Sequence, residues 1–318
     1  MAIDKTKGFQ SVQLAYRLQF LELMKRLETE YSAISNELQD RIQAVINKYA
    51  NDGILNKTDL SAIQGELDGV ALWFSTNYGK WLDDNLARTI DIAVLGQDTA
   101  SMYFVKRMIA ERQIAAGLES EIYKKVLVRQ QYGTGLNNAI RQGIWNQRWS
   151  EDNLKLSDRI WKTDANLRAN LKAMIEQCVN EGRSAVEFSK AVEEYLKNPG
   201  KRWTTQIKPS VTGRGSLDYQ SLRLARSEIN AAYHQATNIA AINNPMVRGV
   251  KFNLSRSHPR KDICDIWASQ DIHGLGPGIY RSGESPREHP NGLCFLTLEL
   301  FKGQQLTDIL KQKYQKLA

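Results

Sequence analysis

Hydrophobic residues follow a helical period through the first half of the chain. From Leu27 to Tyr49 apolar side chains recur every three or four positions, which places them on one face of a helix. We expect this helix to begin near Ser11 and to end at Gly53, because glycine readily adopts the left-handed turn that closes a helix. A second helix is predicted over residues 60–92, where Gly79 is a candidate break.

The same period continues from about residue 100 to residue 148. Gly117 and the glycines at 133 and 135 interrupt it, so several shorter helices are expected there. Because no strand pattern intervenes, residues 1–150 are predicted to form one all-helical module. Its long apolar stripes are consistent with packing inside the chain, with self-association or with docking on a partner.

A helical hairpin is predicted within residues 151–200. Its first helix ends at Gly182, and Ser184 and Glu187 then form a capping box, in which each side chain bonds the backbone of the other. The second helix ends before Pro199, because proline cannot continue a helix. Residues 201–217 combine basic residues with glycine and are interpreted as a linker or an exposed loop.

The pattern changes in the last third of the chain. A helix over residues 218–242 precedes a strand at 247–254, a turn-rich stretch at 255–291, a second strand at 293–300 and a short basic helix at 303–318. Residues 218–318 are therefore predicted to be a small α+β domain. The predicted fold class is mainly α: an elongated helical N-terminal module, then a helical hairpin, then this α+β domain.

The charge of the chain favours an anionic partner. The 318 residues include 43 lysines and arginines against 35 aspartates and glutamates, a net charge of +8. Such an excess attracts polyanions, and double-stranded DNA is a candidate. The candidate contact residues are the cations of the basic loop and of the helix that follows it, together with one aromatic ring that can stack on a base: Lys201, Arg202, Trp203, Lys208, Arg214, Arg223 and Arg226.

Cysteine usage and hydropathy restrict the setting of the protein. The three cysteines, an odd number in a chain of this length, do not indicate a disulfide framework, so reduced thiols are expected. No secretory signal is recognisable at the N-terminus, and no segment reaches the ~20 apolar residues of a membrane helix. We therefore expect no membrane association.

Histidine and cysteine gather near the end of the chain. His258, Cys264, His289 and Cys294 offer the two imidazoles and two thiolates of a tetrahedral zinc site, with Asp262, Asp265 and His273 as further donors. Their spacing is wider than in zinc fingers, so buried thiols and hydrogen-bonded imidazoles that pin a loop are the competing interpretation. A third interpretation is a hydrolytic site that uses a histidine and an aspartate of this loop.

The last third also resembles a known family. The run Arg223-Leu-Ala-Arg226-Ser227-Glu228-Ile-Asn230 is followed by a Gly-Val-Lys-Phe strand, and His289-Pro290-Asn291 with Cys294 precedes the final strand. This order is similar to that of the Mu F-like minor head proteins of tailed bacteriophages, over residues 160–300. The chain departs from the family pattern in having Ser227 for a threonine and Gly292 in place of the first cysteine of the terminal motif.

The resemblance implies a non-enzymatic minor head protein. Such a protein would act at the portal vertex in head assembly, DNA packaging or DNA delivery, with portal or other capsid proteins as partners. It would lie in the phage head, and in the host cytoplasm during assembly. Two alternatives stay open, both centred on residues 255–294: a metal-dependent nuclease or hydrolase, and a zinc-stabilised nucleic-acid-binding module. No cofactor is expected apart from the candidate zinc.

Overall fold

The structure is a computed structural model that describes most of the chain. The described residues are 6–111, 113, 116–133, 135–148, 153–197, 205–210, 216–256, 258, 261–290 and 292–314. The chain divides into two compact units, each assembled from separated segments. Unit 1 comprises Met1–Met24, Asn85–Ile144 and Arg226–Ala318, and unit 2 comprises Lys25–Asp84 and Trp145–Ala225.

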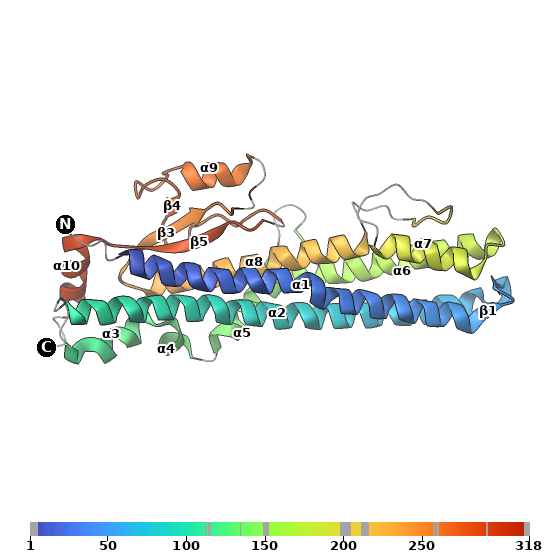
Figure 1. Cartoon of the computed structure of the whole chain (residues 1–318), viewed down its shortest axis with the longest axis horizontal. Coiled ribbons are helices and arrows are strands. Elements are labelled where there is room, and N and C mark those ends of the chain that lie inside the picture. The colour runs from blue at the N-terminus through green and yellow to red at the C-terminus, as the bar shows by residue number, and fades with distance from the viewer. Residues whose placement is uncertain are drawn as a thin grey trace. The chain divides into compact units, whose positions relative to one another are not determined.

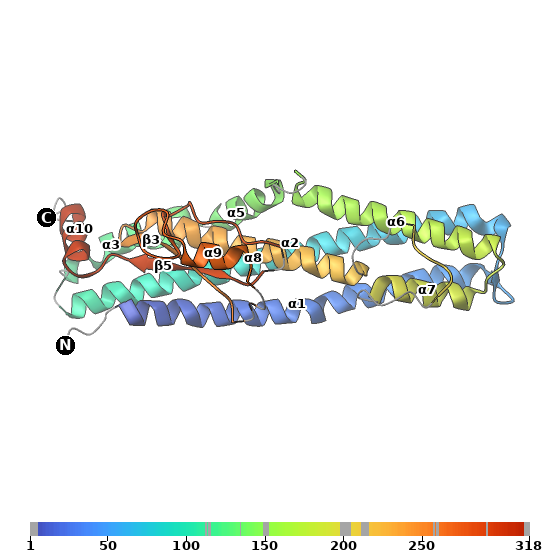
Figure 2. The same cartoon turned by 90° about the horizontal axis from the view of Figure 1, so that it is seen from above.

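Unit 2 is helical. It contains the second part of α1 (Thr6–Tyr49), the first part of α2 (Leu60–Ala110), α6 (Leu156–Asn180), α7 (Ala185–Lys197) and the start of α8 (Leu217–Asn243). Figures 1 and 2 show the α6–α7 hairpin lying along α1 and α2. A short antiparallel hairpin, β1 (Ala50–Asn51) and β2 (Ile54–Leu55), and the 3-10 turn η1 (Lys57–Asp59) connect α1 to α2. The predicted helical hairpin is thus confirmed.

Local chemistry sets the turn between α6 and α7. Gly182 has a φ of +64°, the left-handed conformation that glycine adopts without steric cost. The backbone N–H of Glu187 donates to Ser184 Oγ (3.2 Å), and the N–H of Ser184 donates to Glu187 Oε2 (3.0 Å). This is the capping box that the sequence predicts. The backbone N–H of Ala185 also donates to the Gly53 carbonyl (2.9 Å), which ties this turn to the β1–β2 hairpin.

Aromatic side chains fill the middle of unit 2. Tyr31 of α1 and Phe74 and Tyr78 of α2 are at most 1% exposed, and Tyr78 stacks on Phe74 with 5.8 Å between ring centroids. Tyr31 lies edge-on to Tyr78 at 6.1 Å. The hydroxyl of Tyr78 donates to the Ser221 carbonyl of α8 (2.7 Å), so the ring cluster also fixes the start of α8. Burial of such rings is the main stabilising contribution in this unit.

Unit 1 carries the sheet. Strands β3 (Val247–Asn253), β4 (Ile279–Tyr280) and β5 (Phe295–Leu300) form an antiparallel sheet in the order β4-β3-β5. Figure 1 shows α9 (Ile263–Ser269) on one side of the sheet and α8 on the other, and the view of Figure 2 agrees. The two predicted strands are therefore present, and the two-residue strand β4 is an addition that the sequence did not indicate.

Unit 1 also contains the start of α1, the second part of α2 and several short helices. The short helices are the 3-10 turn η2 (Ala116–Leu118), α3 (Glu119–Val126), α4 (Val128–Tyr132), α5 (Gly135–Asn146, of which residues 135–144 fall in this unit) and α10 (Gly303–Tyr314). Asp98 of α2 accepts the backbone N–H groups of Val128 (2.6 Å) and Arg129 (3.1 Å), so one carboxylate caps the start of α4.

One glycine allows the sheet to form. A Cβ atom on Gly249 in β3 would lie 2.5 Å from the Tyr280 carbonyl oxygen of β4, so any side chain there would push the two strands apart. The register of β3 and β5 also shifts between Val247 and Gly249, which is a bulge. The position therefore requires glycine for close approach of the backbones.

One sequence-based expectation about the helices differs from the structure. The candidate break at Gly79 is wrong, because α2 continues without interruption to Ala110. Glycine costs a helix about 1 kcal/mol, and the buried residues on either side of it, Tyr78 and Leu82, offset that cost. The compact units combine segments from both halves of the chain. The domain bounds expected from the sequence stay a prediction.

Candidate functional site

In unit 1, side chains of α8 bind the segment that precedes β5. Glu228 is 1% exposed and forms an ion pair with Arg287, with 3.2 Å between Oε2 and Nη2. The Asn230 amide donates to the Glu288 carboxylate and to the Cys294 carbonyl, at 3.2 Å for the carbonyl. Two stretches about 60 residues apart in sequence are therefore joined by charged and polar contacts.

His234 contributes a further contact, one helical turn after Asn230. Its Nε2 donates to the Cys294 carbonyl (3.0 Å), and its ring lies edge-on to Phe252 of β3. Burial lowers the pKa of His234 to about 4, so the imidazole is neutral at physiological pH. The backbone carbonyl of Cys294 is thus held by two side chains of α8.

Glu288 occupies the centre of this network. Its Oε1 accepts the backbone N–H of Cys294 (2.6 Å). Burial raises the pKa of this carboxyl to about 7, although the Cys294 N–H partly offsets the effect. The residue facing it is Gly292, where any Cβ would collide with the Glu288 carboxylate. Gly292 therefore leaves room for this carboxylate.

Arg17 of α1 closes the same network from another direction. Its Nη2 donates to the Leu293 carbonyl (2.5 Å), and its guanidinium lies 4.5 Å from the ring centroid of Phe20, 5.3 Å from that of Tyr233 and 4.9 Å from that of Phe295. Burial lowers the pKa of Arg17 to about 10, so it still carries a positive charge at neutral pH. Its Nε and Nη1 have no hydrogen-bond partner among the described residues.

The start of α9 positions one of the predicted ligands, Cys264. Asp262 is the N-cap of α9: its Oδ1 accepts the backbone N–H of Cys264 (2.7 Å), while Asp265 Oδ2 accepts the N–H of Asp262 (2.8 Å). This second capping box places Cys264 in the first turn, where it is buried. Burial raises the pKa of the Cys264 thiol and raises that of Cys294 to about 11.

His258 lies between α9 and Cys294. Its Nε2 is 2.9 Å from Asp265 Oδ2, and its Nδ1 is 4.0 Å from Cys294 Sγ. The hydrogen bond to Asp265 raises the pKa of His258 and lowers that of Asp265. The imidazole therefore directs one nitrogen to a carboxylate and the other to a sulfur atom.

His289 also lies beside the start of α9. Its Nδ1 is 3.1 Å from the Pro290 carbonyl oxygen, and its Nε2 is 3.1 Å from Asp262 Oδ2. The ring is partly exposed, with 35% of the side chain accessible. One nitrogen of His289 faces a backbone carbonyl, and the other faces the carboxylate at the start of α9.

Possible ligand atoms form three overlapping groups, each with all its ligand atoms within 4.8 Å of one another. They are Asp262 with Cys264 and His289, Cys264 with Glu288 and Cys294, and His258 with Asp262 and Asp265. The structure therefore places the four predicted ligands, His258, Cys264, His289 and Cys294, in one connected cluster, which we call the thiol–imidazole cluster. Such a cluster has the donor types that bind zinc.

The sequence did not predict one residue of the thiol–imidazole cluster, Glu288, and it suggested one donor, His273, that lies outside the cluster. Glu288 was not predicted, and the only signal for it is its position directly before His289. His273 was a further donor, but its Nε2 lies 3.4 Å from Glu284 Oε2, its ring packs edge-on to Tyr280, and it belongs to none of the three groups.

The predicted nucleic-acid contacts are only partly described. Lys201, Arg202, Trp203 and Arg214 lie outside the described residues. Lys208 is exposed, and its backbone N–H donates to Gln177 Oε1 (3.1 Å). Arg223 is exposed and Arg226 is half-buried, both on α8. The predicted basic contact surface stays a prediction.

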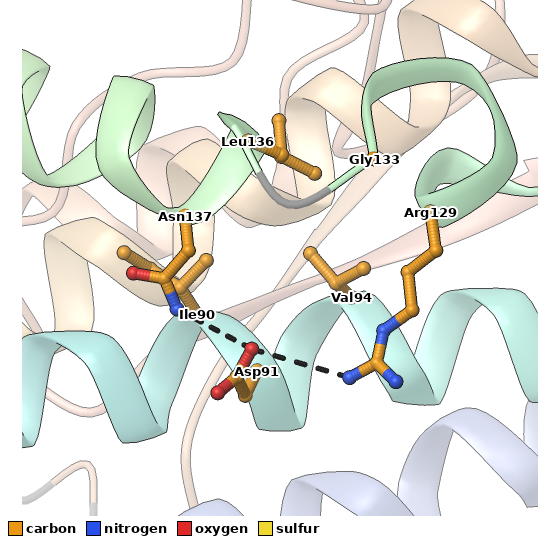
Figure 3. Close-up of a pocket in the computed structure, with 7 residues that line it drawn as sticks. All are labelled: Ile90, Asp91, Val94, Arg129, Gly133, Leu136 and Asn137. Carbon is orange, nitrogen blue, oxygen red and sulfur yellow. Dashed lines mark hydrogen bonds and ion pairs between the residues drawn. The ribbon is translucent and has the colours of Figure 1, made fainter.

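A separate pocket of about 470 Å³ lies in unit 1 beside α2 (Figure 3). Asp91 and Arg129 stand at its polar side, 4.0 Å apart, and Asn137 donates to Asp91 (3.3 Å). Its apolar lining is Ile90, Val94 and Leu136. Because the polar groups bind one another, the pocket presents an apolar surface rather than a set of convergent catalytic groups.

Comparison with protein-family models, with curated proteins and with solved structures gives no match for this chain. Among the described residues, no helix combines the length and the apolar character needed to cross a membrane.

Proposed function

We propose that this chain is a minor head protein of a tailed bacteriophage, acting at the portal vertex in head assembly, DNA packaging or DNA delivery. One observation carries the proposal. The run Arg223–Asn230, on which the resemblance rests in part, contacts the segment that holds the second motif, His289-Pro290 with Cys294. Glu228 pairs with Arg287, and Asn230 donates to the Cys294 carbonyl. Motifs that were recognised only by their order are thus in contact in the fold.

The remaining features support a binding role. The net charge of +8 suits a chain that lies close to packaged DNA. Long helices offer extended surfaces for portal or other capsid proteins, and α1 exposes Leu14 and Leu18 to 47% and 64%. Isolated apolar side chains at a surface are common, so these two alone do not define an interface.

Quantitative mass spectrometry of purified heads and of assembly intermediates tests this proposal. We expect the chain in one or both, at a copy number no greater than that of the portal protein. Ultraviolet crosslinking of the same particles should attach DNA to peptides that contain the predicted basic residues, with peptides of the β1–β2 hairpin as the internal control. Absence of the chain from heads and from intermediates alike would overturn the proposal.

A further inference from the structure

We propose that His258, Cys264, His289 and Cys294 bind one Zn²⁺ ion, with Asp265 and the Pro290 carbonyl as outer partners that orient the two imidazoles. The inference concerns the thiol–imidazole cluster of unit 1. It does not depend on the function proposed above, because it rests only on the donor atoms and their geometry.

The hydrogen bonds of the two histidines select the nitrogen that is available to a metal. Asp265 accepts from His258 Nε2 (2.9 Å), so in the neutral imidazole the lone pair is on Nδ1, which faces Cys294 Sγ at 4.0 Å. His289 Nδ1 lies 3.1 Å from the Pro290 carbonyl, which can only accept, and the tautomer that donates this bond has its lone pair on Nε2. Metal-binding histidines characteristically donate their other N–H to a carboxylate or a carbonyl, as both do here.

With this tautomer, three donor groups come together at the start of α9. His289 Nε2 faces Asp262 Oδ2 at 3.1 Å, and Asp262, Cys264 and His289 each have a ligand atom within 4.8 Å of the other two. A proton on Nε2 would satisfy this one contact, but it would not account for the second sulfur and the second imidazole nearby. One divalent cation among the four donors satisfies them together.

The donor types favour zinc over magnesium or calcium. Thiolate and imidazole ligands suit Zn²⁺, whereas Mg²⁺ and Ca²⁺ prefer oxygen. Zinc–ligand bonds of about 2.0–2.3 Å give ligand-to-ligand distances of roughly 3.3–3.8 Å in a tetrahedron. Three of the six pairs of proposed ligands are close. The 4.0 Å between His258 Nδ1 and Cys294 Sγ is slightly longer than this range, and Cys264 has its ligand atom within 4.8 Å of those of His289 and Cys294. The three groups do not pair His258 with Cys264 or with His289, nor His289 with Cys294, so binding would also require both imidazoles to turn toward the thiols.

Binding would join three parts of unit 1 at a single point. His258 follows β3, Cys264 begins α9, and His289 and Cys294 precede β5. Both thiols must lose a proton to coordinate the ion, so binding releases protons to solvent while no bond of the chain is oxidised or reduced.

Metal analysis of the full chain, expressed with zinc in the medium, is the first test. We expect one zinc per chain, and a loss of more than half of it in C264S, C294S, H258A and H289A. Two matched controls should keep the metal: C178S, because Cys178 is a buried cysteine of unit 2, and H273A, because His273 pairs with Glu284 outside the cluster.

A spectroscopic test keeps the proposal falsifiable if a variant fails to fold. Cobalt exchanged into the unmodified protein should show the strong visible bands of tetrahedral Co²⁺ and thiolate-to-cobalt charge transfer. A zinc content near zero together with no cobalt spectrum would overturn the proposal, as would an intact mass showing Cys264 and Cys294 joined as a disulfide. If E288Q loses the metal while H289A keeps it, Glu288 is the fourth ligand and the proposed set is wrong.

Discussion

Asp218 in unit 2 and Glu288 in unit 1 are both half-buried carboxylates, but they have different neighbours. Asp218 accepts hydrogen bonds from the hydroxyls of Tyr31 (3.1 Å) and Ser35 (2.8 Å). Among the described residues, it belongs to none of the groups of possible metal ligands. Glu288 shares its surroundings with Cys264 and Cys294. Burial raises the pKa of both carboxyls. Burial alone therefore does not mark a functional site, whereas the chemistry of the neighbouring groups does.

The two units differ in the same way as a whole. The described part of unit 2 has a core of aromatic rings, and the carboxylate of Asp218 attaches the start of α8 to α1. Unit 1 has an apolar sheet as well, but its α8 is attached to the segment before β5 by charged and polar contacts. The following changes test this contrast, beginning with the largest expected effect.

Removing a ring from the unit 2 cluster should have the largest effect. Phe74→Ala leaves a cavity beside Tyr78 and should lower the free energy of unfolding by roughly 3–5 kcal/mol. Urea unfolding measures the loss, and hydrogen exchange reports whether it is concentrated in unit 2. Leu72→Ala, at a site 47% exposed on the same helix, is the control and should change stability far less. Equal losses in the two variants would contradict an aromatic core in this unit.

Breaking the ion pair of unit 1 should have the next largest effect. Arg287→Ala leaves Glu228 buried without this partner, which should cost about 3 kcal/mol. Replacing Glu228 by Gln in the same variant should recover part of the loss, because a neutral amide is less costly to bury. Both are measured by urea unfolding, with exposed Arg281→Ala as the control. If the two arginine variants unfold alike, the ion pair does not stabilise unit 1.

The smallest effect concerns the pH dependence of Asp218. Burial raises the pKa of Asp218 in the folded state above the unfolded value near 3.9, so the folded state binds the proton more tightly. This carboxyl therefore makes the free energy of unfolding decrease as pH rises through the interval between the two pKa values. Asp218→Asn removes that contribution, so its stability relative to the unmodified protein should increase over the same interval. Ser35→Ala, which deletes a hydrogen bond to the carboxylate, should steepen the fall. Unfolding series at several pH values measure both, and parallel profiles would contradict the assignment.

Much of the fold could be predicted from local patterns. The helical period of residues 27–49, the capping box at Ser184 and the strand at 247–254 each depend on neighbours a few positions away, and all three are present. The length of α2 could not be predicted, because the packing that carries the helix through Gly79 comes from distant segments. Strand β4, with two residues, is too short to show a pattern.

The candidate site could be predicted from the sequence only in part. Residue type alone pointed to His258, Cys264, His289 and Cys294, although His258 and Cys294 are 36 positions apart. The role of Glu288 depends on contacts with Asn230, 58 residues earlier, and on the absence of a side chain at Gly292. Neither the contact with Asn230 nor the missing side chain at Gly292 produces a periodic pattern in the sequence. The role of Glu288 can therefore be recognised only in the folded structure.

The burial of the cysteines also makes the chain convenient for site-specific labelling. Cys178, Cys264 and Cys294 are all buried, and burial raises the pKa of each thiol, so few of these sulfurs are reactive thiolates at neutral pH. A cysteine introduced at exposed Lys57, just after the β1–β2 hairpin, would be the fast-reacting thiol among the described residues. A dye attached there would label one position of the protein without removal of any native cysteine.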